Sequence, residues 1–329
     1  MIVNVDKRFL KRTLVEQEKD ASEMIMLLQR GHFLLMEPDV KNELYLLVES
    51  NLLTWQKEIF NESDELLNPT VMMKRWLTTI NFYDYTERQR HILLQTPSEL
   101  LVENGHNEWP VYKRIIHAYK ENNTYSSVFG YIEASITNDN LKSCHLGGKG
   151  EIPATLDFKE TDTEFQNLYR FKVCVLFDRD TDNDEGFSRE NSRLFMKLCN
   201  KDFSTVDCND IYKLDFGTGY IWHSWYKRAI ENYFPKSEYE KLGINMNDYP
   251  SDKDSYDYIK FPIESTKEWQ KAHKTKKEKK VAKYEKDLLS KIGSDMNMGD
   301  YEASLKKFNV DGINLSELEL FLLKIAKIA

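Results

Sequence analysis

Short apolar runs alternate with helical stretches in the middle of the chain. Three runs have the length and composition of buried strands, at 100–102, 144–146 and 171–177. Helices are expected from about Glu108 to Lys120 and from about Arg189 to Cys199. Strands that alternate with helices favour a parallel sheet with helices on both faces. We therefore predict an α/β domain over residues 96–235.

Both flanks of this domain are predicted to be largely helical. In residues 1–95, apolar residues recur at helix-like spacing, which indicates a helical N-terminal domain for interaction or homodimer formation. Residues 236–329 begin with a polar, irregular linker. Ten lysines against four acids follow between Lys267 and Lys291, as is typical of an exposed helix. The last segment, Leu315 to Ile325, is amphipathic and should dock on a core as part of a helical C-terminal region.

Composition and charge narrow the functional classes. The 329 residues include 54 acids and 46 bases, and the net charge of −8 argues against a general nucleic-acid coat protein. An enzyme with a local basic track is compatible with this balance. The four cysteines form no CxxC pair, which argues against structural zinc. The first residues lack a signal peptide, and no apolar run reaches the ~20 residues that span a membrane. We therefore expect a cytoplasmic protein with no membrane partner.

Acidic residues directly follow two of the predicted strands. Glu103 follows Leu100–Val102, and Asp178 and Asp180 follow Val173–Phe177. Ligand sites of open parallel sheets lie beyond the carboxyl ends of the strands, so the three carboxylates should converge. Mg²⁺ prefers oxygen ligands and keeps waters for a phosphate substrate, which predicts a Mg²⁺ or Mn²⁺ site. The alternatives are a surface turn at Glu103 and a solvated acidic loop, because further acids follow Asp180.

A glycine-rich segment, Gly147–Gly150, lies between these acids in the sequence. The backbone N–H groups at Gly148 and Gly150 can approach an anion, and Lys149 adds a positive charge. We predict that this loop binds the phosphate of a substrate. An ordinary glycine-rich turn is the alternative.

The aromatic segment Trp222–Pro235 supplies further cations. Lys227 and Arg228 are expected to contact phosphate, and the aromatic rings could stack on bases. The alternative is a packed amphipathic helix, which is preferred for Trp225, Ile230 and Phe234.

Together these segments resemble the TOPRIM domain, the catalytic module shared by topoisomerases, primases and overcoming-lysogenization-defect (OLD) nucleases. Leu-Leu-Val-Glu-Asn-Gly-His-Asn-Glu-Trp at 100–109 resembles the first motif of that domain, and Val-Leu-Phe-Asp-Arg-Asp at 175–180 resembles its second, the DxD motif. The first motif departs from the family pattern, because Asn104 stands between Glu and Gly and the later acid is Glu108 rather than Asp. The resemblance implies a Rossmann-like TOPRIM sheet over residues 96–235.

The same resemblance implies roles for individual residues. Glu103 would be a general acid/base or metal ligand, Asp178 and Asp180 would hold Mg²⁺, and Lys149 would belong to the catalytic group. The Gly-Gly-Lys-Gly loop and Lys-Arg-Ala-Ile-Glu-Asn-Tyr-Phe-Pro at 227–235 resemble TOPRIM nucleases of bacterial anti-phage systems, including the effector of PARIS-type defence.

A Mg²⁺-dependent endonuclease is therefore the expected function, acting as a toxin that a partner, often an ATPase, holds in check. RNA, and tRNA in particular, is the favoured substrate. The resemblance to defence effectors that stop growth by disabling translation implies it, and the sequence contains no recognisable duplex-DNA reader such as a helix-turn-helix or zinc finger. DNA is the alternative, since OLD-type nucleases cut it. A non-enzymatic interaction protein with a degenerate TOPRIM fold is the other alternative. A topoisomerase would need a strand-passage gate and a primase would need template-handling modules, which the sequence does not show.

Overall fold

The computed structural model describes most of the chain. The described residues are 1–103, 105–121, 123–165, 167–181, 186–201, 205–206, 210–211, 213, 219–261, 289–302, 305 and 307–329. Most of the predicted Lys-rich helix, from Lys267 to Lys291, lies outside these residues. Within them, no helix is both long enough and apolar enough to cross a membrane.

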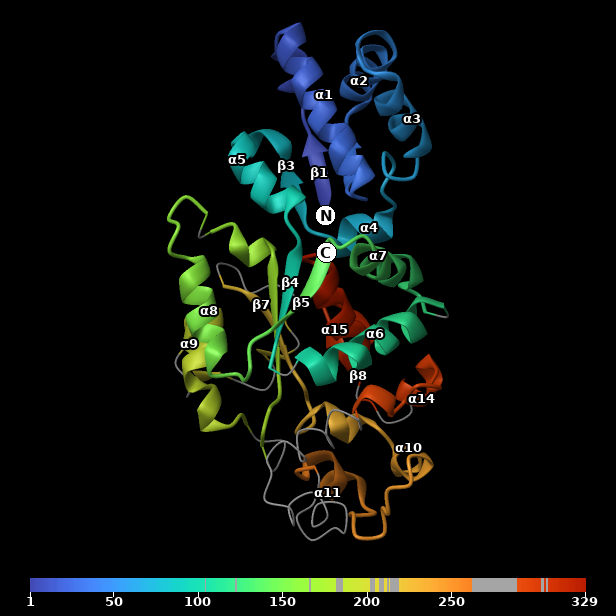
Figure 1. The fold of residues 1–329 in the computed structure, drawn as a ribbon, viewed down its shortest axis with the longest axis vertical. Helices are drawn as coiled ribbons and strands as arrows, with labels where there is room; N and C mark the ends of the chain where they lie inside the picture. Colours follow the sequence, from blue (N-terminus) through green and yellow to red (C-terminus); the bar gives the residue numbers. More distant parts are fainter. Residues whose placement is uncertain are drawn as a thin grey trace.

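A four-stranded parallel sheet forms the centre of the lower half of the molecule (Figure 1). Its strand order is β5-β4-β6-β7, and the strands are β4 (Ser98–Val102), β5 (Leu141–His145), β6 (Val173–Phe177) and β7 (Ile221–Ser224). The predicted α/β class and its parallel sheet are therefore confirmed. Strand β7 replaces the helix that was considered for the aromatic segment. Trp225, Ile230 and Phe234 are nevertheless buried, as expected for packed residues.

Helices cover both faces of this sheet because its strands are apolar on both sides. Along β4, Leu100 and Val102 face one core, whereas Leu101 faces the other, as the alternation of a strand requires. The first core is closed by α6 (Gly105–Glu121), α7 (Ser126–Thr137) and α15 (Glu317–Ala326). The second is closed by α8 (Glu151–Lys159) and α9 (Ser192–Cys199), on the left in Figure 1. The 3-10 turns η4 (Tyr169–Phe171) and η5 (Arg189–Asn191) precede β6 and α9.

The N-terminal region contains a second parallel sheet, which corrects the prediction of a helical domain over residues 1–95. Its strands, in the order β2-β1-β3, are β1 (Ile2–Val5), β2 (Phe33–Met36) and β3 (Thr79–Asn81). Each strand has only three or four residues, too few to interrupt the helical periodicity around it. The surrounding helices are α1 (Leu14–Gln29), α2 (Pro38–Asn51), α3 (Thr54–Glu62), α4 (Val71–Trp76) and α5 (Glu87–Arg90), with the short turns η1 (Phe9–Lys11), η2 (Phe82–Asp84) and η3 (His91–Gln95).

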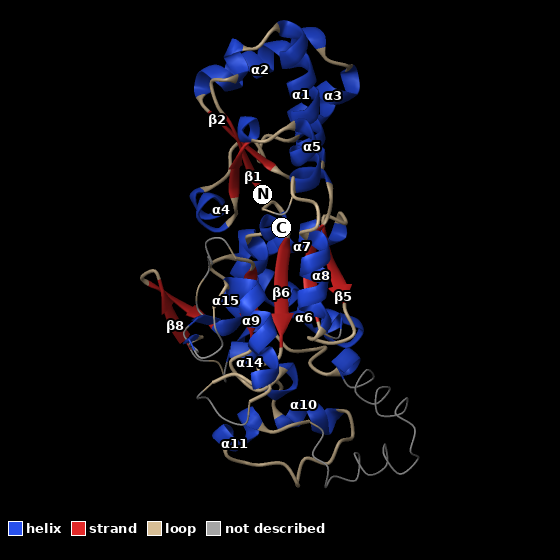
Figure 2. Cartoon of the chain, turned by 90° about the vertical axis from the view of Figure 1, so that its left-hand side faces the viewer, coloured by secondary structure: helices blue, strands red, loops and turns tan. Residues whose placement is uncertain are grey.

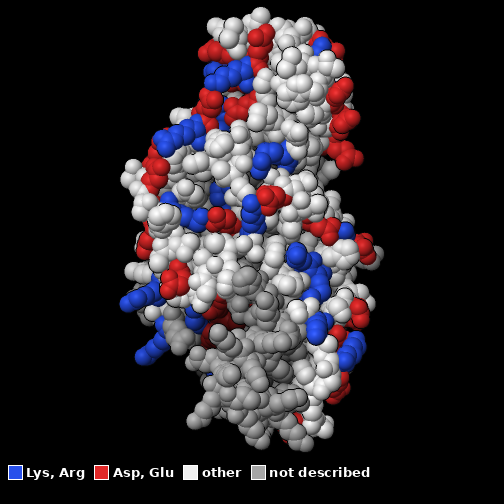
Figure 3. Space-filling model, viewed as in Figure 1, with Lys and Arg blue, Asp and Glu red and all other residues white. Residues whose placement is uncertain are grey.

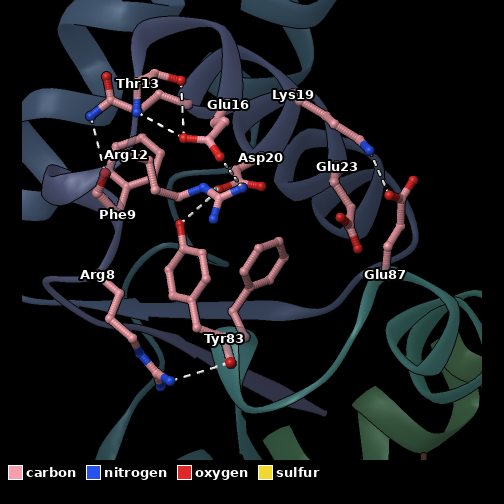
Figure 4. Close-up of polar contacts among 12 residues, drawn as sticks. Arg8, Phe9, Arg12, Thr13, Glu16, Lys19, Asp20, Glu23, Tyr83 and Glu87 are labelled. Carbon is pink, nitrogen blue, oxygen red and sulfur yellow. Dashed lines mark hydrogen bonds and ion pairs between the residues drawn. The ribbon is translucent and has the colours of Figure 1, made fainter.

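A polar network fastens α1 to the turn that follows β3 (Figure 4). Arg12 forms an ion pair with Asp20 at 2.7 Å, and the Tyr83 hydroxyl donates to the same carboxylate at 2.9 Å. Burial raises the pKa of Asp20, although Tyr83 and Arg12 both favour its charged form. At the surface, Lys19 pairs with Glu87 at the start of α5. The network therefore holds the helical layer against its sheet.

The two ends of the chain meet between the two sheets (Figures 1 and 2). The N-terminal ammonium of Met1 donates to the carbonyl of Ala329 at 2.7 Å. Thr78 and Ser98 donate through their hydroxyls to the carbonyls of Lys327 and Ile328. The segment after α15 therefore joins the N-terminal region to the amino end of β4.

The remaining C-terminal elements surround the lower end of the larger sheet. They are η8 (Ile230–Tyr233), α10 (Lys236–Lys241), α11 (Lys253–Tyr258), α14 (Met298–Glu302) and the antiparallel pair β8 (Lys307–Val310) and β9 (Ile313–Ser316). Residues 236–260 thus contain two short helices, where an irregular linker was predicted. The predicted docking of the last helix is confirmed, because α15 is buried along its whole length. The arrow of β6 points toward α10 and α11, so the carboxyl ends of the strands face this layer (Figure 2).

Candidate functional site

The first predicted acid, Glu103, lies at the carboxyl end of β4 and is held by two loops. Its Oε2 accepts a hydrogen bond from the backbone N–H of Asp178 at 3.1 Å, at the end of the neighbouring strand β6. Its Oε1 accepts from the backbone N–H of Lys149 at 3.2 Å. The parallel pairing of β4 with β6 therefore brings together two carboxylates that are 75 residues apart in the sequence.

The glycine-rich loop reaches Glu103 through its backbone. Gly147 and Gly148 have φ angles of +80° and +143°, in the region that favours glycine. This turn lets the N–H of Lys149 point at the carboxylate just before α8 begins. The loop thus binds an anionic group as predicted for such a loop, but the anion in the structure is a side chain of the same protein. Phosphate binding by Gly148 and Gly150 stays a prediction.

The Lys149 side chain pairs with Asp180. Its ammonium donates to Asp180 Oδ2, so both groups of Lys149, backbone and side chain, contact predicted site carboxylates. Asp180 has a φ of +54°, in the left-handed region that few non-glycine residues adopt. Its backbone N–H donates to the carbonyl of Arg228 at 3.1 Å, and Arg228 Nη1 donates to the Thr181 carbonyl at 3.3 Å. Arg228 therefore lies against the same loop.

Lys227 has different surroundings from its neighbour Arg228. Its side chain is buried and pairs with Asp257 at 2.8 Å, while its Nζ donates to the Asn232 carbonyl at 3.0 Å. The sequence predicted a phosphate contact for Lys227, and that contact stays a prediction. In the structure, Lys227 joins the loop after β7 to α11.

Arg179, between the two aspartates, is fully buried and serves the fold. Its Nε donates to the Gly186 carbonyl at 2.6 Å, and its Nη1 donates to the Tyr226 carbonyl at 2.7 Å. The guanidinium also lies over the rings of Phe187 and Tyr226. These contacts connect the loop after β6 to the loop after β7, and thereby position the aspartates on either side of Arg179.

Asp178 experiences the negative charge of four other acids. Burial raises the pKa of Asp178 well above its usual range, and the charges of Glu231, Glu108, Glu103 and Asp180 raise it further. The pKa of Glu103 is also raised by burial, against the lowering effect of its two backbone hydrogen bonds. We call these five residues the carboxylate cluster. Figure 3 shows acidic atoms recessed in a hollow at the level of the strand ends.

Two members of the carboxylate cluster were not predicted as site residues. Glu108 stands in the first turn of α6, where it accepts a hydrogen bond from the Tyr112 hydroxyl. Glu231 stands in η8, within the aromatic segment. Glu108 could have been identified as a site residue from its position in the segment that resembles the first motif. The only sequence feature that points to Glu231 is its position close to the predicted phosphate-binding residues Lys227 and Arg228.

The donor set of the carboxylate cluster suits Mg²⁺ or Mn²⁺. Mg²⁺ is usually held by one or two carboxylates, with waters and substrate phosphate completing its shell. Among the residues that the structure describes, no three His, Cys, Asp or Glu side chains are arranged as a ready chelating group. The observation that favours a cation is electrostatic. The Lys149 ammonium already pairs with Asp180, and the pKa of Asp178 is raised by burial and, in addition, by the charges of its acidic neighbours.

Comparisons with known proteins add no assignment to this geometry. No protein-family model, no curated protein and no solved structure matches the chain.

Proposed function

We propose that this protein is a Mg²⁺- or Mn²⁺-dependent endonuclease of the TOPRIM type that hydrolyses phosphodiester bonds in nucleic acid. The observation that carries the proposal is the carboxylate cluster at the carboxyl edge of the parallel sheet. Asp178 is half-buried there, and both desolvation and the charges of four other acids raise its pKa. Acids with perturbed pKa values at the carboxyl ends of parallel strands are typical of catalytic sites. In such sites the functional use of clustered like charges outweighs their cost in stability.

The carboxylate cluster and Lys149 have separate roles in the proposed reaction. Glu103, Asp178 and Asp180 would hold the metal ion, and the negative charges of Glu231 and Glu108 add to the field at Asp178 that attracts a cation. A bound divalent ion supplies charge neutralisation at the phosphate and lowers the pKa of a coordinated water. Glu103, with a pKa raised by burial, is suited to accept a proton from the attacking water. Lys149 can contribute positive charge toward the phosphate when it leaves Asp180.

The substrate we favour is RNA, with tRNA as the specific candidate, and the biological role we propose is that of a toxic effector in anti-phage defence. A regulatory partner such as an ATPase and a cytoplasmic location belong to the same proposal. Their support is the resemblance of the first and second motifs, the glycine-rich loop and the 227–235 segment to such nucleases. DNA cleavage of the OLD type is the competing assignment.

Purified protein should be incubated with Mg²⁺ or Mn²⁺ and separate pools of tRNA, single-stranded DNA and duplex DNA. We expect discrete tRNA breaks that require the divalent ion and that fall by about 10²–10⁴-fold in Glu103→Gln, as for loss of a general base or metal ligand. The matched control is Glu99→Gln, because Glu99 lies on the same strand but forms an ion pair with Lys159.

Glu99→Gln should cleave like the wild type. Cleavage of DNA with intact tRNA would assign the substrate to the OLD-type alternative. Absence of divalent-dependent cleavage in all three pools, or full activity in Glu103→Gln, would sink the nuclease assignment.

A further inference from the structure

A pocket of about 560 Å³ lies between η8 and the starts of α10 and α11. Its walls include Phe234 and Pro235 after the loop of β7, Lys236 on α10, and Lys253 and Tyr256 on α11. The volume falls in the range of pockets that enclose small ligands or single groups of larger ones. None of the residues given a role under the proposed function lines this pocket.

The pocket shares its wall with the carboxylate cluster. Glu231 of η8 acts on Asp178, whereas the next residue, Asn232, lines the pocket. Lys227 also lines the pocket, and the carbonyl of the adjacent Arg228 accepts the backbone N–H of Asp180 at 3.1 Å. Because consecutive Cα atoms are about 3.8 Å apart, the pocket begins within about two residue lengths of the cluster.

Lysines dominate the charged lining of this pocket. Four lysines and three acids are among its described lining residues. Two of the lysines are matched by acids, since Lys227 pairs with Asp257 and Lys241 pairs with Glu238.

The other two lysines have no carboxylate partner among the described residues. The Nζ of Lys236 donates to the Tyr249 carbonyl at 2.5 Å, and Lys253 is exposed at the start of α11. Among the described lining residues, the remaining acid is Asp300, whose carboxylate accepts a hydrogen bond from the backbone N–H of Asn297. The pocket therefore carries a net positive charge next to a strongly negative cluster.

A polyanion that reaches the carboxylate cluster must overcome its negative field, and nearby cations are the means to do so. Lysine binds phosphate as a compact charge with three donors. We propose that this pocket binds a backbone phosphate of a single-stranded nucleic acid, with Lys236 and Lys253 as its contacts. The assignment of that strand as a substrate rests on the proposed function, whereas binding itself does not.

The test measures binding without cleavage. Fluorescein-labelled oligo(U) and oligo(dT) are titrated with protein in EDTA over a series of salt concentrations, and anisotropy gives the Kd. The pocket variant is Lys236→Ala/Lys253→Ala. The control is Lys74→Ala/Lys307→Ala, which removes the same charge from two exposed lysines on α4 and β8. Lys236→Arg/Lys253→Arg tests rescue by charge.

We expect the pocket variant to bind both oligonucleotides about tenfold more weakly, with a salt slope shallower by about 0.7, as for one lost phosphate contact on a single strand. The control should bind within about twofold of the wild type, and the arginine variant should recover most of the affinity. Equal loss with oligo(U) and oligo(dT) indicates a phosphate contact, as proposed.

The proposal is overturned if the pocket variant and the control bind alike, or if the wild type binds neither oligonucleotide. Cleavage by the wild type in a parallel Mg²⁺ assay separates the two ideas. If the wild type cleaves and the pocket variant binds as tightly as the control, the phosphate-binding role of the pocket is wrong and the nuclease assignment stands. Pocket-dependent binding without cleavage supports the pocket and removes the nuclease assignment.

Discussion

Two buried lysines should make the protein more stable as the pH rises from 7 to 9. Lys324 on α15 is fully buried and donates to the carbonyls of Trp222 and Ile211, while Lys172, just before β6, donates to the carbonyls of Leu93 and Thr96. Burial is the main cause that lowers the pKa of each lysine from 10.5 to about 7. Both lysines therefore lose their charge in the folded protein at a pH where the unfolded chain keeps it.

The sign and size of the effect follow from proton linkage. Between pH 7 and 10.5 the unfolded chain binds more protons than the folded protein, so the free energy of unfolding rises with pH. Each lysine contributes up to about 1.4 kcal/mol per pH unit in this window, and its full penalty applies below pH 7. Above pH 9 the rise becomes shallower, because burial raises the pKa of the Cys174 thiol to about 12 and this thiol then offsets the contribution of one of the two lysines.

Urea unfolding followed by circular dichroism at pH 7, 8 and 9 measures this slope. We expect the wild type to gain stability across the series and Lys324→Met to lose about half of the gain. Lys74→Met, on the exposed side of α4, is the control and should keep the wild-type slope. A wild-type stability that is flat or falls from pH 7 to 9, or a Lys324→Met slope equal to that of the wild type, would refute the reasoning.

The carboxylate cluster gives further predictions. Asp178→Asn should abolish cleavage but raise the melting temperature in EDTA, because it removes a charge that burial and Glu231 disfavour; a lower melting temperature would contradict the repulsion. Asp180→Asn should abolish cleavage with the fold intact, as checked by circular dichroism. Glu231→Gln should reduce Mg²⁺-dependent cleavage by about 10-fold or more, whereas Glu240→Gln on the exposed side of α10 should not. Equal activity of these two variants would remove Glu231 from the site.

The strands of the larger sheet differ in how readily the sequence predicts them. The run Val173–Phe177 is buried on both faces, so its unbroken apolar pattern identifies β6. Strand β7 escaped prediction because His223 and Ser224 interrupt its apolar run and because a packed amphipathic helix was preferred for Trp225, Ile230 and Phe234. Pairing with β6 buries His223 all the same. Tertiary pairing thus outweighed the local pattern.

The site shows a similar limit. Glu103 and Asp178 could be predicted to meet because each ends a recognisable strand, and parallel strands carry their ends to one edge. Glu231 follows no apolar run and reaches Asp178 through a 3-10 turn. The environment of Lys227 was equally hidden, since its pairing with Asp257 joins residues 30 apart through the fold of the C-terminal region. Local spacing carries no information on either contact.

The way in which Glu103 is held argues that the carboxylate cluster has a use beyond stability. Backbone N–H groups of Asp178 and Lys149 fix its position without cancelling its charge, and the charge of the Lys149 ammonium favours the ionised form of Glu103. Nearby, Lys227 and Asp257 join two loops with a matched ion pair. The fold can therefore connect these loops with balanced charges. A group of partly buried acids that together raise the pKa of Asp178 lowers the stability of the fold. Such local conflicts are expected where function requires them.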